Sequence, residues 1–123
     1  MTPRRILLLA FLATITTVSN AQVPIIDYGF LVDDPDVVVN NAANALAQPL
    51  GEMTAEAWGK SYDTNLRGPV FLVQKALPHL RASPAAAVLN LVSVGAFNFA
   101  PNVSMYAAGK AALLSFTRSM AAG

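Results

Sequence analysis

The sequence contains no cysteine and a single histidine, His79. The absence of cysteine excludes disulfide bonds and thiolate chemistry, and it leaves the redox compartment of the protein undetermined. One histidine argues against a metal site built on imidazole ligands. No metal is therefore expected in this chain.

Charge is also scarce. Charged residues make up 12% of the 123 residues, about half the share usual in a soluble domain. A surface this poor in charge suggests extensive subunit contacts or missing partner segments. The formal net charge is +1 without a basic cluster, so no nucleic-acid partner is expected. Apolar residues, at 54%, suffice for the core of one domain.

The first 21 residues have the layout of a secretory signal peptide. Arg4 and Arg5 precede the largely apolar run Ile6–Val18, and small residues follow before the expected cleavage point. The run has 13 residues, whereas a membrane-spanning helix needs roughly 20, so no stable membrane span is expected. The alternative is that Ile6–Ile15 is a buried strand behind a misplaced start site. Residues 1–21 taken alone favour export.

A linker at residues 22–35 separates this segment from two short apolar runs that are typical of buried strands. The first run, residues 36–39, is β-branched and stops at Asn40 and Asn41. The second is residues 86–92. Strands that alternate with helices indicate a parallel α/β sheet, and more than 45 residues between the two runs allow a helical crossover.

Two helices are predicted, over about 54–80 and about 104–120. Thr54 and Ser104 are the expected N-caps. Gly68-Pro69 should bend the first helix, and Pro78 and Ser83-Pro84 should mark its end. An apolar stripe at steps of three or four residues predicts the buried face of the first helix: Trp58, Tyr62, Leu66, Val70, Val73, Leu77 and Leu80.

Three polar side chains are expected near the carboxyl ends of the strands, where open parallel sheets bind ligands. Ser93 directly follows the second strand, while Tyr106 and Lys110 are four apart and share a helix face. An ammonium favours the phenolate form of a nearby tyrosine, which then exchanges protons more readily. A serine hydroxyl can bind the same substrate oxygen. The three groups together predict proton transfer at a carbonyl oxygen, although each has a plain structural explanation when taken alone.

These residues resemble the motifs of the short-chain dehydrogenase/reductase family over about residues 36–122. The segments that carry the resemblance are Asp36-Val-Val-Val-Asn-Asn-Ala-Ala43, Asp63-Thr-Asn-Leu-Arg-Gly68, Asn90-Leu-Val-Ser93 and Tyr106-Ala-Ala-Gly-Lys110. Ala43 replaces the glycine of the first motif. The resemblance implies a partial Rossmann-like, doubly wound parallel sheet at residues 36–123.

The resemblance also implies the role of each site residue. Tyr106 would be the acid/base and would also contact the cofactor, and Lys110 would bind the nicotinamide ribose. Ser93 would orient the substrate carbonyl, and Asn65 would hold a relay water from a break in the helix. Asn41 would contact the cofactor, which is NAD or NADP without a choice between them. Subunits of the family pair through the two helices, so a homo-oligomer through about 54–80 and 104–120 is implied.

The sequence departs from the family at both ends. No Thr-Gly-x-x-x-Gly-x-Gly turn, which would hold the pyrophosphate at a helix N-terminus, occurs in residues 1–35. The first strand–helix–strand unit and the C-terminal strand are expected to be missing as well. Two functions therefore remain open. One is an NAD(P)-dependent oxidoreductase that interconverts a small-molecule secondary alcohol and a carbonyl, and the other is a non-catalytic interaction or dimerisation fragment. The family implies a cytoplasmic location, against the export that residues 1–21 favour.

Overall fold

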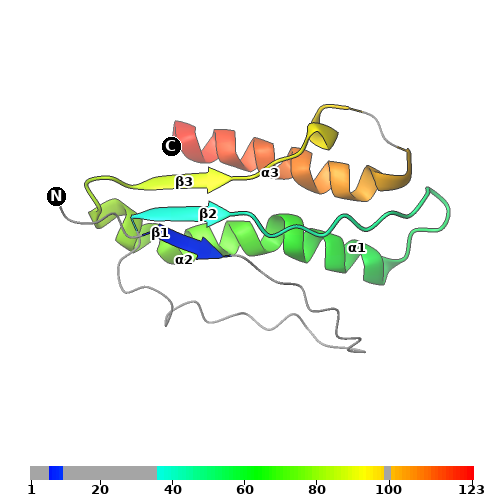
Figure 1. Cartoon of the computed structure of the whole chain (residues 1–123), viewed down its shortest axis with the longest axis horizontal. Coiled ribbons are helices and arrows are strands. Elements are labelled where there is room, and N and C mark those ends of the chain that lie inside the picture. The colour runs from blue at the N-terminus through cyan, green and yellow to red at the C-terminus, as the bar shows by residue number, and fades with distance from the viewer. Residues whose placement is uncertain (1–5, 10–35, 99–100) are drawn as a thin grey trace.

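The described part of the chain forms a three-stranded parallel sheet in the order β1-β2-β3 (Figure 1). The structure is a computed structural model that describes residues 6–9, 36–98 and 101–123. The strands are β1 (Ile6–Leu9), β2 (Val37–Asn40) and β3 (Ala87–Asn90). Asn40 pairs with Asn90 in the register, so β2 and β3 end at the same edge of the sheet. The predicted α/β parallel sheet is confirmed.

β1 lies inside the segment for which a signal peptide is predicted. Ile6–Leu9 pairs in parallel with β2 over its whole length. A strand here is what the alternative interpretation of the N-terminal segment expects. The remainder of residues 1–21 and the whole predicted linker at 22–35 lie outside the described residues. Cleavage after residue 21 thus stays a prediction, which N-terminal sequencing of the mature protein would check.

The crossover between β2 and β3 is helical, as predicted, but it is not one uniform helix. The helical elements are α1 (Ala55–Tyr62), the π-helix η2 (Asp63–Arg67), α2 (Gly68–Ala82), the 3₁₀ turns η3 (Val94–Ala96) and η4 (Pro101–Val103), and α3 (Ser104–Ala122). The irregularity precedes Pro69, which occupies the first turn of α2, where its missing N–H costs little. Within the described ranges, no helix combines the length and apolar character needed to cross a membrane.

The helix-end predictions were right at one position and wrong at two. α2 ends at Ala82 with Ser83 as its C-cap, as Ser83-Pro84 predicts, but it continues past Pro78, because that proline lies within a helix whose neighbouring turns are held by packing. Ser104 is the first residue of α3 rather than its cap, since Val103 holds the N-cap position without a side-chain hydrogen bond. Both differences show that a terminator or cap residue places a helix end only to within a turn.

The core lies between one face of the sheet and the pair α2 and α3. Val38 is fully buried, and Val88 beside it in the register packs against the same cluster. Both helices contribute to this cluster: Leu72, Val73, Ala76 and Leu80 from α2, and Phe116 and Met120 from α3. Side chains alternate along a strand, so Leu89 points to the other face, where it is 56% exposed. The described helices therefore cover one face of the sheet.

The buried face of the α1–η2–α2 helix differs from the predicted apolar stripe. Trp58 is 45% exposed and stacks on Tyr62, with ring centroids 4.4 Å apart. The side chains turned inward lie one position earlier along much of the helix: Ala57, Ser61, Asn65, Pro69, Leu72, Val73, Ala76 and Leu80. Small and polar residues occupy the inner face because α3 approaches closely there. A Cβ on Gly109 of α3 would lie 3.5 Å from the Cβ of Asn65.

Thr54 is the N-cap of α1, as predicted, and its hydroxyl accepts a hydrogen bond from Ala57 N at 3.1 Å. Replacing Thr54 with alanine leaves that N–H without its partner. The change should lower the free energy of unfolding by about 1 kcal/mol. Urea unfolding of the variant beside Thr54→Ser, which keeps the hydroxyl, measures the effect. Equal midpoints for the alanine and serine variants would contradict the cap.

Candidate active site

The candidate site lies at the edge where β2 and β3 end. Asn41 directly follows β2 and is exposed, and Ser93 comes three residues after the end of β3. Tyr106 and Lys110 lie in the first two turns of α3. The topology therefore brings these four predicted site residues to one end of the sheet.

Lys110 is the most constrained residue of the site. Its side chain is 2% exposed, and Nζ donates a hydrogen bond to the carbonyl oxygen of Leu91 at 2.8 Å. The same nitrogen lies 5.9 Å from the centroid of the Tyr106 ring. Burial lowers the pKa of Lys110 below its ordinary value, because the charged form loses hydration. A buried ammonium is thus held between the end of β3 and the tyrosine.

The lowered pKa of Lys110 makes stability depend on pH with a definite sign. As pH rises, the folded chain releases this proton before the unfolded chain does. Between the lowered pKa and the ordinary 10.5, the unfolded state binds more protons, so stability rises with pH. In Lys110→Met this contribution is absent. Urea unfolding from neutral pH up to about pH 10 should show the wild type gaining stability relative to Lys110→Met. If the free energy of unfolding depends on pH in the same way in both proteins, the burial of a charged Lys110 is contradicted.

Ser93 sits on a short turn that packs against the start of α3. It is the N-cap of η3, and its Oγ accepts a hydrogen bond from Gly95 N at 3.1 Å. A Cβ on Gly95 would lie 3.8 Å from the Cβ of Ala107, the neighbour of Tyr106. The turn therefore rests on the helix beside the tyrosine. Because Oγ acts as the acceptor in this bond, its own O–H stays available as a donor.

Asn65 lies in the middle of η2 and is fully buried. Its side-chain amide forms a reciprocal pair with the backbone of Asn44: Nδ2 donates to Asn44 O at 2.6 Å, and Oδ1 accepts from Asn44 N at 3.0 Å. Nδ2 also donates to Ser61 O at 2.9 Å. Both amide hydrogens are therefore in use, and the side chain fastens the loop after β2 to the helix.

Two partners in the site were missed by the sequence interpretation. Leu91 supplies the acceptor for Lys110, and Asn44 supplies both backbone partners of Asn65. Each partner is a backbone atom, and every residue has such atoms, so the residue type does not identify the contact. Leu91 directly follows β3 and Asn44 lies in the loop four residues after β2. These positions were the available signal, since backbone groups beyond strand ends lack ladder partners.

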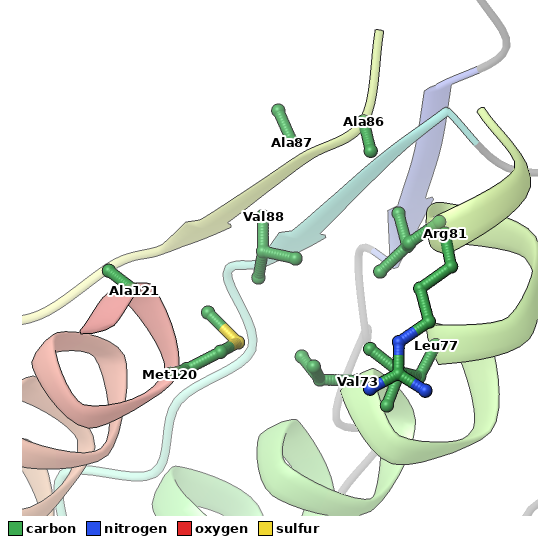
Figure 2. Close-up of a pocket in the computed structure, with 9 residues that line it drawn as sticks. Val73, Leu77, Arg81, Ala86, Ala87, Val88, Met120 and Ala121 are labelled. Carbon is green, nitrogen blue, oxygen red and sulfur yellow. The ribbon is translucent and has the colours of Figure 1, made fainter. Parts of the chain in front are cut away.

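A groove of about 380 Å³ lies at the opposite end of the sheet (Figure 2). It is lined by the start of β3 and by the last turns of α2 and α3, and Figure 2 shows Arg81 reaching into it from α2. Ser93, Tyr106 and Lys110 do not line this groove. It is therefore separate from the candidate site.

The arrangement is suited to proton transfer at a substrate oxygen. A tyrosine ring lies near a buried ammonium, and a serine hydroxyl is carried on the adjoining turn. Among the described residues, no group of acidic, cysteine or histidine side chains could hold a metal ion. The fold and the site together define an α/β protein of the Rossmann-like class.

Comparisons with known proteins agree with this class. The family model for short chain dehydrogenases matches residues 30–123. The chain is 45% identical over 86 residues to the short-chain dehydrogenase/reductase FrzI of Cladobotryum sp, covering 70% of this chain and 33% of that protein. This chain belongs to the short-chain dehydrogenase/reductase family, whose members include oxidoreductases.

Two solved structures extend the comparison. A blue fluorescent protein from a metagenomic library, in complex with NADPH, is 36% identical with a TM-score of 0.66, over 71% of this chain and 35% of that one. A 4-hydroxyisoleucine dehydrogenase complexed with NADH and succinate is 27% identical with a TM-score of 0.67, over 72% of this chain and 42% of that one. The chain spans about a third of the length of the curated relatives it matches.

Proposed function

We propose that the chain carries the catalytic residues of an NAD(P)-dependent oxidoreductase that interconverts a secondary alcohol and a carbonyl. The observation that supports this most directly is the buried ammonium of Lys110, which is bound to Leu91 O and lies beside the Tyr106 ring. Burying a lysine costs free energy unless its ammonium group is paired with an opposite charge or forms hydrogen bonds. A structural lysine on an exposed helix face would not need this placement.

In the proposed reaction, Tyr106 donates a proton to the substrate oxygen during reduction and removes it during oxidation. The Lys110 ammonium stabilises the phenolate that forms when the proton leaves. The Ser93 O–H donates a hydrogen bond to the same oxygen and steadies the charge that develops there. Each of these groups acts only if the substrate oxygen reaches the space between the η3 turn and α3.

Asn65 would act through its backbone. Its amide side chain is already committed to Asn44 and Ser61. Its carbonyl oxygen cannot receive the usual α-helical hydrogen bond from four residues later, because that residue is Pro69 and has no N–H. This oxygen is thus the acceptor we assign to a relay water that would connect Lys110 with solvent.

The described residues fit one end of a nicotinamide cofactor. Lys110 uses one of its three N–H groups on Leu91, so two stay available for the hydroxyls of the nicotinamide ribose. Tyr106 and the exposed Asn41 flank the same edge of the sheet. For the pyrophosphate, the sequence offers no glycine-rich turn of the family type. When bound, the nicotinamide would give or accept the hydride, and the choice between NAD and NADP stays open.

A homo-oligomer through the α1–α2 and α3 helices is part of the proposal. The apolar stripe that was predicted to be buried is open to solvent at Trp58, which is 45% exposed, and Phe71 of α2, outside that stripe, is 51% exposed. Exposed large aromatic side chains are enriched in protein interfaces. Sedimentation of the wild type beside Trp58→Ser would show whether this face pairs subunits.

Cofactor binding is the decisive experiment for the proposed function. Calorimetry of the full chain should show saturable binding of NADH or NADPH, and Lys110→Met should weaken it while Ser93→Ala should not. The reason is that Lys110 would touch the ribose whereas Ser93 would touch the substrate. The absence of saturable binding at millimolar cofactor would exclude catalysis by this chain on its own.

A second candidate function is a non-catalytic interaction fragment. It is favoured by the exposed apolar residues on the uncovered sheet face and beyond β3, among them Leu89 at 56%, Val94 at 70% and Phe97 at 63%. Such a surface promotes association with another polypeptide. Size-exclusion chromatography and thermal melting test this second function, since a compact monomer that melts cooperatively would argue against the interaction fragment.

A further inference from the structure

A chain of polar side chains runs between the sheet and α3, close to the candidate site. Asn40 Nδ2 donates to Asn90 Oδ1 at 2.6 Å, across the last residue pair of β2 and β3. Asn90 Nδ2 donates to Thr117 Oγ1 at 2.9 Å. Thr117 Oγ1 in turn donates to Leu113 O at 2.7 Å. Asn40 is 6% exposed and Leu113 is fully buried, whereas Asn90 and Thr117 are half-buried, so these bonds are partly shielded from water.

The polar chain differs in kind from the packing around it. One step back on the same face, Val38 and Val88 meet apolar side chains of the helices, including Phe116 and Met120. Apolar contacts of this type tolerate small shifts of a helix, and methionine adapts to them readily. Hydrogen bonds lose strength steeply when distance or angle changes. The Asn90–Thr117 bond therefore restricts the position of α3 more sharply than its apolar neighbours do.

Two consecutive residues at the end of β3 hold α3. Asn90 binds Thr117, and Leu91 accepts the hydrogen bond of Lys110. Lys110 precedes Thr117 by seven residues, so the two lie on the same face about two turns, or roughly 10 Å, apart. Lysine has a long flexible stem that follows a moving helix, whereas threonine is short and stiff at its first torsion. Of the two contacts, the threonine is the one that can set the helix position.

We propose that Thr117 is a positioning residue: through Asn90, its hydroxyl fixes α3 on the sheet at the place where Lys110 meets the Leu91 carbonyl. The importance of this placement for a reaction rests on the proposed function of Lys110 and Tyr106. The contact between Thr117 and Asn90 is independent of that function and can be tested without cofactor or substrate.

Protection of Lys110 against reductive methylation provides the test, with the extent of labelling measured by peptide mass spectrometry. The full chain is labelled as wild type, Thr117→Val and Thr117→Ser, and labelling of the exposed Lys75 serves as the internal reference. Valine keeps the shape of threonine without the hydroxyl, whereas serine keeps the hydroxyl. We expect Thr117→Val to raise the relative labelling of Lys110 about tenfold and Thr117→Ser to leave it within about twofold of the wild type.

A matched control separates positioning from general loss of stability. Met120→Ala weakens the same helix packing without touching the polar chain, so Lys110 should stay protected in that variant. If Thr117→Val does not fold, Thr117→Ala replaces it, because alanine is the best helix former. Unchanged protection in the folded variant, or equal loss in Thr117→Ser or Met120→Ala, overturns the proposal. If Lys110 protection depends on the Thr117 hydroxyl but the chain binds no cofactor, the proposed oxidoreductase function is refuted while the positioning role of Thr117 stands.

Discussion

Replacing Tyr106 with phenylalanine should lower kcat for alcohol–carbonyl interconversion by about 10²- to 10⁴-fold, the usual contribution of a general acid or base. The hydroxyl is the proton donor of the proposed reaction, and the ring that remains preserves packing beside Lys110. The Kd for the cofactor should change little, because the Lys110 ammonium keeps its bond to Leu91 O. Steady-state kinetics together with calorimetry measure the two effects separately.

Tyr62→Phe is the matched control for this experiment. Tyr62 ends α1 and stacks on Trp58, on the outer side of the helix, so loss of its hydroxyl should leave turnover unchanged. A Tyr106→Phe variant that keeps more than about a tenth of the wild-type kcat would remove Tyr106 from the acid/base role. The proposed site would then lack its proton donor.

Replacing Asn65 with alanine should destabilise the chain by about 2–4 kcal/mol. The side-chain amide pairs with both backbone groups of Asn44, which are partly buried, and with the buried Ser61 O, and its removal takes this partner from all three groups. Leaving a buried donor or acceptor unpaired costs about 1–3 kcal/mol each, and rearrangement of the loop recovers part of that. The shift in urea midpoint gives the size of the loss.

Asn102→Ala is the matched control, because it also removes a side-chain amide but at an exposed position. Asn102 is exposed in the η4 turn, so its replacement should change stability by less than about 0.5 kcal/mol. Hydrogen exchange adds a local measurement: the amide of Asn44 should lose protection in Asn65→Ala. A loss of stability below about 1 kcal/mol would show that the Asn65–Asn44 pair is replaced by water.

Much of the fold could be predicted because its signals are local. The β-branched run that stops at Asn40 and the apolar run before Ser93 are short patterns that identify strands. Thr54 identifies the start of α1 because a cap acts within three residues. The spacing of Tyr106 and Lys110 needs only the helical period to put both on one face.

The parts that could not be predicted depend on contacts distant in sequence. Asn65 and Asn44 are 21 residues apart, and their pairing follows from how the loop after β2 folds back. The π-helix around Asn65 adds a residue to the turn and shifts the helix face, so a regular 3.6-residue period assigns Trp58 to the wrong side. The close approach of Gly109 likewise becomes visible only when α3 is placed beside η2.

The acceptor that holds Lys110 is the main-chain oxygen of Leu91, so the side chain at position 91 takes no part in the hydrogen bond. Leu91 is 38% exposed, and exchanging its side chain leaves the carbonyl in place. Natural substitutions at position 91 should therefore preserve the hydrogen bond that holds Lys110, while changes at position 110 should abolish it. The hydrogen bond from Lys110 to a main-chain oxygen depends on the backbone conformation at the end of β3, and it is kept wherever that conformation is kept.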